Sequence, residues 1–482
     1  MFLTITQIFK PPGITGASGS PNLYRTLDNS VRKFTWRDYR IGGLGEATIE
    51  LFEPFEDVTN FQSGLWLIFG CRGGYLSTAV AAGATSLNLN SASYVCSDIT
   101  QNFSEFNVGD IILISDGINT DMMSVASVSG LDSAIIGLAA SVNQGSIGLL
   151  NSYGIGTKVV RLMYQGYMYN RPRDASFENK YSISAQGFFS RFNNVLVNAN
   201  IVKQDCADSV KGILSEYTTT LPFISFNASN FATTNGIACN IQAQEQSIVS
   251  VLQNLLTFEN GYTAGAVWSV WVDAQRVVHH GQLPTSGTAT RTFNIQLQNA
   301  LGDVCGILHL DDQDLTQLLN MVIVYGGQMP NGQQLRILVQ ELASITQYGF
   351  YEGVLQNINL IDNQTAATWA AAQLAVKAYP RTTGSLPLLE TTARITPRDY
   401  IQIVGFTDSS SLFGNITDIE YIVDANTLGI TARISIDQPM PDLKEIMDEV
   451  ASEKSQKSLS VAPGTSLADA FVVSGFDLVF GP

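Results

Sequence analysis

The sequence predicts a β-rich α+β protein, because short strand-like runs dominate it and few segments have helical spacing. The best-defined helix runs from Asn363 to Tyr379, where Asn363 can cap its start and Pro380 stops it. Strand-like runs lie on both sides of it: Met321 to Tyr325, Tyr400 to Val404, Asn415 to Val423 and Leu428 to Ile436. The last two runs predict a hairpin.

The predicted helix has a mostly small apolar face with one bulky residue, Trp369. The other members of this face are Ala366, Ala367, Ala370, Leu374, Ala375 and Ala378. Because such a face requires a sheet to cover it, we expect the helix to lie on the strands that follow it, as part of a β-barrel.

The composition limits the class of protein. At 482 residues the chain is too long for one core and predicts three or four domains. Only 14% of residues are charged, and the net charge of -16 argues against a surface that binds nucleic acid or anionic lipid. DNA can pass such a surface without binding to it.

Targeting and cysteine signals are weak. Met1 to Phe9 lacks the features of a secretory signal, and no apolar window is long enough to span a bilayer, so no membrane insertion is expected. The odd and scattered cysteines predict reduced thiols made in a cytosol. These are Cys71, Cys96, Cys206, Cys239 and Cys305.

Changes in composition divide the chain into five parts. Residues 1–74 with 157–200 are expected to form a first β-barrel domain, interrupted by an inserted all-β module at 75–156. Residues 201–290 have the two helical patterns of a small α+β domain. Residues 291–438 are expected to form a second β-barrel domain, and 439–482 a C-terminal helix and tail.

No motif predicts catalysis, a cofactor or a metal. His279 and His280 are neighbours in a strand and point to opposite faces, so an exposed pair beside a turn is favoured over a zinc site. The acidic run 311–314 lacks the glycine and bidentate Glu of a calcium loop and predicts a solvated helix start. Asp116-Gly117 predicts a hairpin turn. Core or interface positions are expected for Trp66, Trp268, Trp271 and Trp369.

Several segments, taken in order, resemble the hub proteins at the tips of bacteriophage tails and of related contractile injection devices. They are Phe34-Thr35-Trp36 with Ile41-Gly42-Gly43-Leu44-Gly45, the run Trp271 to Val278, the run Asn320 to Gly327, and Arg394 to Tyr400 before a hairpin. None of these segments identifies the family on its own. Taken in this order, they extend the resemblance over about four fifths of the chain. The departure from the family pattern is the module 75–156.

The resemblance implies a mechanical role. Such hubs are similar to two tail-tube barrels fused in one chain, so that a homotrimer joins a six-fold tail tube to a three-fold spike or central fibre. The implied partners are a tail tube or distal tail protein, the spike or fibre, other baseplate proteins, and genomic DNA that passes without specific binding. The implied location is the virion tail tip, assembled in the bacterial cytoplasm.

The interface candidates are Trp36, Trp369, Tyr325, Tyr400, Phe476 and Phe480. Two other functions stay open. One is a distal tail ring or adhesin protein whose module 75–156 binds carbohydrate. The other is a tail-associated cell-wall hydrolase, although nothing in the sequence identifies a particular pair of Asp or Glu residues as the catalytic carboxylates of such an enzyme.

Overall fold

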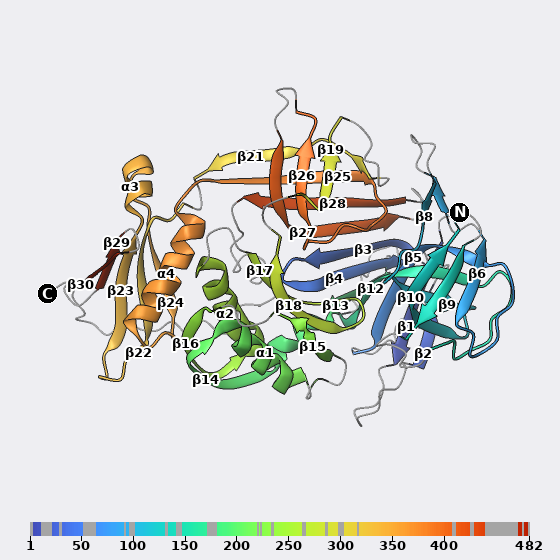
Figure 1. Cartoon of the computed structure of the whole chain (residues 1–482), viewed down its shortest axis with the longest axis horizontal. Helices are drawn as coiled ribbons and strands as arrows, with labels where there is room; N and C mark the ends of the chain where they lie inside the picture. Colours follow the sequence, from blue (N-terminus) through green and yellow to red (C-terminus); the bar gives the residue numbers. More distant parts are fainter. Residues whose placement is uncertain are drawn as a thin grey trace.

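A computed structural model describes most of the chain (Figure 1). The described residues are 3–10, 22–27, 31–51, 64–90, 93–95, 102–130, 134–140, 147–170, 181–218, 221, 224–232, 236–262, 267–284, 288–296, 303–315, 318–406, 411–424, 429–438, 471–474 and 477–480. The predicted β-rich α+β class is confirmed, with large antiparallel sheets and few helices. Within these residues no helix has the length and apolar character to cross a bilayer.

The first unit is a sheet of long antiparallel strands. Its strands are β1 (Thr4–Lys10), β2 (Asn22–Thr26), β3 (Val31–Tyr39), β4 (Gly42–Leu51), β5 (Trp66–Leu76), β12 (Lys158–Asn170) and β13 (Tyr181–Gly187). Neighbouring strands pair in the order β2-β1-β5-β12-β13-β4-β3. The apolar alternation of these strands places one face in a shared core.

The inserted module forms a closed ring of strands together with β5 and β12 of the first unit. Its strands are β6 (Ser86–Asn90), β7 (Ser93–Val95), β8 (Asn102–Ser104), β9 (Ile111–Ser115), β10 (Thr120–Ser129) and β11 (Ile135–Ala139). The pairings run β5-β6-β11-β10-β9-β12 and return from β12 to β5, so two strands of the first unit complete the ring. The module has its own core, which includes Phe106, Ile114 and Met123.

The predicted hairpin turn at Asp116-Gly117 joins β9 to β10. Gly117 has a φ of +90°, and the Asp116 carboxylate accepts hydrogen bonds from the backbone N–H groups of Ile118 and Asn119. The turn therefore has the chemistry that the sequence predicted.

A middle α+β part lies below the large sheet in Figure 1. Its elements are η2 (Phe188–Asn194), β14 (Leu196–Asp205), α1 (Cys206–Tyr217), β15 (Ser225–Phe231), β16 (Ala238–Ser247), α2 (Ile248–Tyr262), β17 (Val267–Val272) and β18 (Val277–Leu283). Asp205 caps α1 by accepting hydrogen bonds from the N–H groups of Ala207 and Asp208. The parallel pairing of β17 with β4 attaches this part to the first unit.

The second unit is also mostly antiparallel. Its strands are β19 (Arg291–Asn294), β20 (Val304–Cys305), β21 (His309–Asp314), β25 (Arg381–Glu390), β26 (Tyr400–Val404), β27 (Leu412–Asp424) and β28 (Gly429–Gln438). The predicted hairpin is β27–β28, whose register runs from Asn415↔Asp437 to Asp424↔Gly429. The expected helix start at 311–314 is wrong, because these residues belong to β21 and pair with β25.

A separate sheet and two helices lie between β21 and β25 in the chain. They are β22 (Met321–Gln328), β23 (Gln334–Gln340), α3 (Leu342–Tyr348), β24 (Glu352–Asn357) and α4 (Asn363–Lys377). Two later strands, β29 (Phe471–Ser474) and β30 (Asp477–Phe480), extend this sheet through parallel pairing of β29 with β23. The C-terminal helix that was predicted within 439–482 falls at 442–457, which lies outside the described residues.

The predicted helix α4 is confirmed, but its expected packing is wrong. It packs against β22, β23 and α2, whereas β26, β27 and β28 belong to another sheet and another core. Its cap is Asp362, which accepts a hydrogen bond from the N–H group of Thr365, not Asn363. Five of the six small or aliphatic face residues are buried, and Ala375 is exposed.

The strand order of the first unit recurs in the second. In chain order β1, β2, β3, β4, β5, β12 and β13 correspond to β19, β20, β21, β25, β26, β27 and β28. Four antiparallel pairs have a counterpart: β3–β4 and β21–β25, β4–β13 and β25–β28, β13–β12 and β28–β27, β12–β5 and β27–β26. The units differ in their first two strands. β1 is antiparallel to both β5 and β2, whereas β19 is parallel to β26 and β20 pairs with β25.

The two units meet edge to edge in one sheet, because β3 pairs with β27. Their strands also share one hydrophobic core. Among the described residues, the strand pairings do not by themselves close either unit into a ring, so the two expected barrels stay a prediction.

Candidate functional site

The internal joint, which we define as residues 33–39 of β3 and 418–424 of β27, holds the two units together. The strands pair antiparallel from Lys33↔Asp424 to Tyr39↔Asp418. Both strands alternate between core and surface, so one face of the joint contributes to the shared core. The joint thus combines a backbone ladder with a buried apolar face.

Aromatic rings fill the buried face of the internal joint. Trp36 stacks on Tyr421 with ring centroids 4.9 Å apart, and Phe34 stacks on Phe69 at 4.0 Å. The Tyr421 hydroxyl group donates a 2.6 Å hydrogen bond to the Ile395 carbonyl oxygen. Burial raises the pKa of Tyr421 well above its ordinary value, so the hydroxyl group keeps its proton and stays a donor.

Charged side chains flank the internal joint. Arg398 of the second unit donates two hydrogen bonds to the Asp38 carboxylate, at 2.9 and 2.8 Å, and one to the Tyr39 carbonyl oxygen at 3.1 Å. Arg37 lies 3.6 Å from Glu420 across the two strands. The two-point contact of Arg398 fixes the relative orientation of the units better than a single ion pair does.

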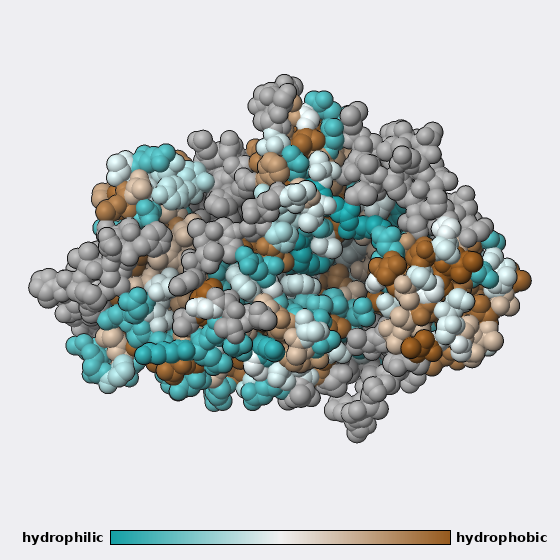
Figure 2. All heavy atoms as spheres, viewed as in Figure 1, coloured by the Kyte–Doolittle hydropathy of each residue, from teal (hydrophilic) through white to brown (hydrophobic). Residues whose placement is uncertain are grey.

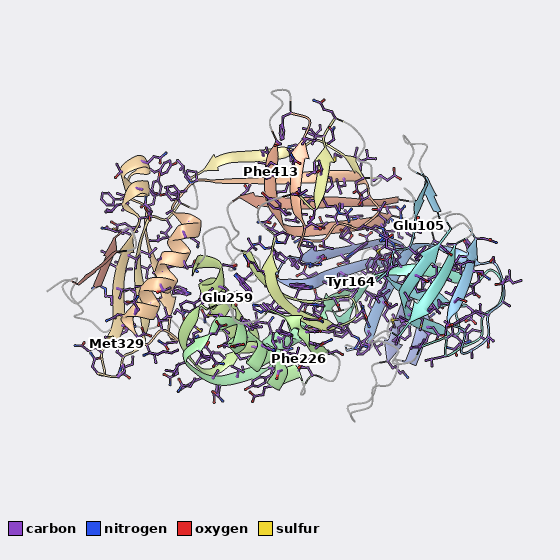
Figure 3. All side chains as sticks on the ribbon, in the orientation of Figure 1. Glu105, Tyr164, Phe226, Glu259, Met329 and Phe413 are labelled. Atoms are coloured by element: carbon purple, nitrogen blue, oxygen red, sulfur yellow. The ribbon has the colours of Figure 1, made fainter. Side chains whose placement is uncertain are left out.

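A second contact, which we call the arginine clasp, joins the inserted module to the second unit. It consists of Arg72, Arg161, Arg394, Glu105, Asp110 and Asp303. Figure 3 shows Glu105 at the boundary between the module and the strands of the second unit. The module is therefore attached at a second place besides the strands β5 and β12.

The clasp is mostly buried and densely hydrogen-bonded. Arg72 donates to both carboxylate oxygens of Glu105, at 3.1 and 3.3 Å, and to the Thr391 carbonyl oxygen. Arg394 donates to both oxygens of Asp110 at 3.2 Å, and Arg161 donates to the Thr392 carbonyl oxygen. Burial, with the nearby Arg394 guanidinium group, lowers the pKa of Arg161 to about 10.

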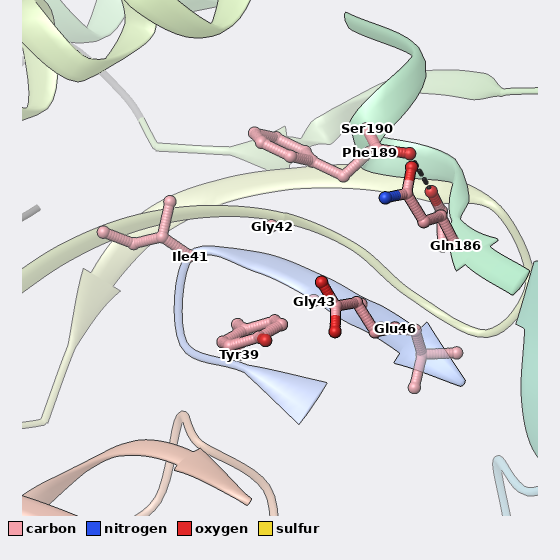
Figure 4. Close-up of a pocket in the computed structure, with 11 residues that line it drawn as sticks. Tyr39, Ile41, Gly42, Gly43, Glu46, Gln186, Phe189 and Ser190 are labelled. Carbon is pink, nitrogen blue, oxygen red and sulfur yellow. Dashed lines mark hydrogen bonds between the residues drawn. The ribbon is translucent and has the colours of Figure 1, made fainter. Parts of the chain in front are cut away.

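A small hollow lies beside the β3–β4 turn and η2 (Figure 4). It opens to solvent and has an internal volume of about 30 Å³, and the titratable side chains that line it are those of Tyr39 and Glu46. Gly43, with a φ of +80°, lies so close to β17 that an added Cβ would be 2.2 Å from the Val272 carbonyl oxygen. The one serine in the lining, Ser190, donates a 2.7 Å hydrogen bond to the Gly187 carbonyl oxygen and not to a carboxylate.

The histidines lie differently from the exposed pair that was predicted. His279 is half-buried and bonds Asp273 at 2.8 Å, but His280 is fully buried and its Nε2 lies 2.9 Å from Glu259 Oε2. Trp268 stacks on His280 with centroids 5.5 Å apart. The described residues contain no group of three or more His, Cys, Asp or Glu side chains that could hold a metal.

The inserted module exposes apolar side chains. Val108, Ile118, Ile147 and Ile155 are each at least two-thirds exposed. Figure 2 shows apolar surface over the part of the molecule where Figure 1 places β6, β9 and β10. This surface is a candidate contact for another protein.

The predicted interface residues are dispersed over the molecule. Trp36 and Trp369 are buried inside the chain, and Tyr325 and Tyr400 are half-buried. Phe480 belongs to β30, and Phe476 lies outside the described residues. Trp36 thus lies at the contact between the two units of one chain. For the other five residues, contact with another chain stays a prediction.

Sequence reasoning missed the clasp and the Arg398–Asp38 pair. One signal was present: Arg161 interrupts the apolar run from Val159 to Met163, and an arginine in such a strand requires a partner. Its partners are far away in the sequence, so the pattern alone does not name them.

Comparisons with known proteins give distant structural likenesses. No protein-family model matches the chain, and neither does any curated protein. The chain is similar to a tail protein from Neisseria meningitidis, with a TM-score of 0.48 and 8% identity over 90% of this chain and 97% of that one. It is also similar to a 43 kDa tail protein of prophage MuSo2 from Shewanella oneidensis, with a TM-score of 0.45 and 9% identity over 90% and 98%.

A component of the type VI secretion system of E. coli is similar as well, with a TM-score of 0.36 and 7% identity over 84% of this chain and 73% of that one. At these scores the likenesses assign neither an activity nor an assembly to this chain. The solved structures it resembles thus include phage tail proteins, the class that its sequence motifs resemble.

Proposed function

We propose that this chain is the structural hub of a phage tail or a tail-like injection machine. In this role three copies join a six-fold tail tube to a three-fold spike or central fibre and form part of the channel for DNA ejection. The observation that supports this most is the recurrence of one strand order in two units that join edge to edge in a single chain.

The symmetry argument is simple. A chain with two similar units presents six units when three copies form a ring, so the same ring can match six-fold and three-fold partners. The domain division 1–74 with 157–200, 75–156, 201–290, 291–438 and 439–482 belongs to this proposal. So does contact of the other predicted interface residues with the tube, the spike or a second copy.

The role is mechanical and not catalytic. A net charge of -16 suits a conduit through which DNA passes without binding, because the walls repel phosphate groups. The buried carboxylates Glu105, Glu259 and Asp303 each contact an internal partner instead of an open cavity. This arrangement favours a structural use of these groups.

Copy number in the intact particle tests the proposal. Cryo-electron microscopy of the tail tip should find three copies, each placing both units in one ring below the tube. Six copies, or a single unit of each chain in the ring, would instead support a distal ring or adhesin protein. Wall-degrading activity of the purified chain in a zymogram would support the hydrolase.

A further inference from the structure

Two cysteines meet in the core of the middle α+β part. Cys206 is the first residue of α1, and Cys239 belongs to β16. Both side chains are buried, with exposed fractions of 0% and 1%, and both belong to the same hydrophobic core. The two residues are 33 positions apart in the sequence, so a covalent link between them would close a long loop.

The pairing of β14 with β16 places the two cysteines on one face. Gln204 lies opposite Cys239, and the Cys206 N–H group donates a 2.8 Å hydrogen bond to the Ile237 carbonyl oxygen. Because side chains alternate along a strand, these four residues share a face, and Cys206 and Cys239 are diagonal neighbours on it. Diagonal neighbours in an antiparallel pair are close enough for their side chains to interact.

The two thiol groups contact each other. A hydrogen bond between the thiol groups of Cys206 and Cys239, together with burial, raises the pKa of Cys206 above its ordinary value. The Cys239 Sγ atom also lies 3.6 Å from the Gln204 carbonyl oxygen, which holds this side chain beside the end of β14. The two sulfur atoms are therefore neighbours before any reaction, as formation of a disulfide requires.

The other described cysteines have no such partner. Burial raises the pKa of Cys71 and of Cys305 to about 12. The charged groups near Cys71 are those of Arg161, Arg72 and Glu105, and the charged group near Cys305 is Asp303. Among the four described cysteines, Cys206 and Cys239 are thus the pair whose thiol groups interact.

We propose that Cys206 and Cys239 form a latent disulfide site, which stays reduced in a cytosol and closes in oxidising surroundings. The oxidant is a low-molecular-weight disulfide, of which oxidised glutathione is an example. One cysteine thiolate attacks a sulfur atom of the oxidant and displaces the first small thiol. The second thiolate then attacks the mixed disulfide and displaces the other. Two thiols of the chain become one disulfide, and the oxidant becomes two thiols.

The disulfide would tie the start of α1 to β16 across the core. Because both thiols are buried and protonated, exchange requires a transient opening of this core, so the reaction should be faster in urea below the unfolding transition. The link restricts the unfolded chain and should raise the midpoint of thermal unfolding of this part by about 5 to 10 °C. This inference does not depend on the proposed function.

Peptide mapping of the full chain tests the site. The chain is incubated with oxidised glutathione, with and without urea below the unfolding transition, and the remaining thiols are then blocked. Trypsin cleaves after Lys203, Lys211 and Arg276, so the two cysteines fall in separate peptides, 204–211 and 212–276. We expect these peptides to be joined, and to separate on reduction. Absence of the link under both conditions, or glutathione attached to either cysteine without the link, overturns the inference.

Matched variants measure the effect on stability. Each variant is compared with itself in the reduced and the oxidised state, so that any effect of the substitution on folding cancels. The parent chain and Cys305→Ala should gain thermal stability on oxidation, whereas Cys206→Ala and Cys239→Ala should not. A gain that persists in Cys239→Ala, or that disappears in Cys305→Ala, assigns the effect to other cysteines and overturns the inference.

Discussion

Trp36 of β3 stacks on Tyr421 of β27 at directly opposed positions of the two strands, with an interplanar angle of 20°. Each ring comes from a different unit, and the residues are 385 positions apart in the sequence. The stack is therefore a long-range contact that joins the two halves of the repeat, and it can be tested separately from assembly.

Truncation of Trp36 should weaken the joint. We expect Trp36→Ala to lower the free energy of unfolding by about 3 to 5 kcal/mol, because the indole is 2% exposed and its loss leaves a cavity. Urea unfolding followed by circular dichroism measures this. Phe413→Ala is the control, since Phe413 is half-buried and stacks on Tyr400 outside the residues of the internal joint. Equal losses in both variants would contradict a special role for Trp36.

The Arg398–Asp38 pair should contribute as a coupled unit. In a double-mutant cycle of Arg398→Ala and Asp38→Ala, we expect a coupling free energy of about 1 to 3 kcal/mol, because both hydrogen bonds connect charged and largely buried groups. Arg398→Lys should lose most of it, since an ammonium group cannot make the two-point contact. A cycle for Arg37 and Glu420, which are more exposed, should give less than about 1 kcal/mol.

We expect the free energy of unfolding to depend on pH through Asp303. Burial raises its pKa above the ordinary value of 3.8, so the carboxyl group favours folding when protonated. Its stabilising effect is fully present below pH 3.8 and is lost as the pH rises through the raised pKa of the folded state.

Asp303→Asn should remove this loss at neutral pH. The amide oxygen can keep the hydrogen bonds that Oδ1 accepts from the Thr391 hydroxyl group and the Thr392 N–H group. The variant should therefore gain stability relative to the parent as the pH rises from 4 to 7, measured by urea unfolding at each pH. A constant difference across this range would contradict the raised pKa.

The small face of α4 should not accept larger residues. Ala370 is fully buried in the core where α4 packs against β22, β23 and α2, so Ala370→Leu should cost about 1 to 3 kcal/mol through overpacking. Ala375→Leu is the matched control, because this alanine lies on the same helix and is exposed. Similar effects of the two changes on thermal unfolding would contradict the described packing.

Local patterns predicted the elements well. The helix α4, the hairpin β27–β28 and the Asp116-Gly117 turn each depend on neighbouring residues, so spacing and turn chemistry suffice. The same patterns failed for packing, because nothing in α4 distinguishes the preceding strands β22 and β23 from the strands that follow.

Long-range contacts explain the other differences. His280 can be buried because it forms a hydrogen bond with Glu259 of α2 inside the core. The sequence does not indicate that these two residues are close in space. The clasp likewise unites Arg72 with residues near position 391. The repeat was invisible as sequence identity because pairing order, unlike side chains, is the property that the two units share.

The ring of the inserted module has a mechanical consequence. Because β5 and β12 run without a break from the first unit into that ring, a pull on the module loads two covalent strands in parallel. Both strands move together under such a load, so shear falls on the ladders that join β5 to β1 and β12 to β13, where many hydrogen bonds are strained together instead of one after another. The appendage is thus a stiff lever, and a force received at its tip reaches the body of the protein without a hinge between these two strands.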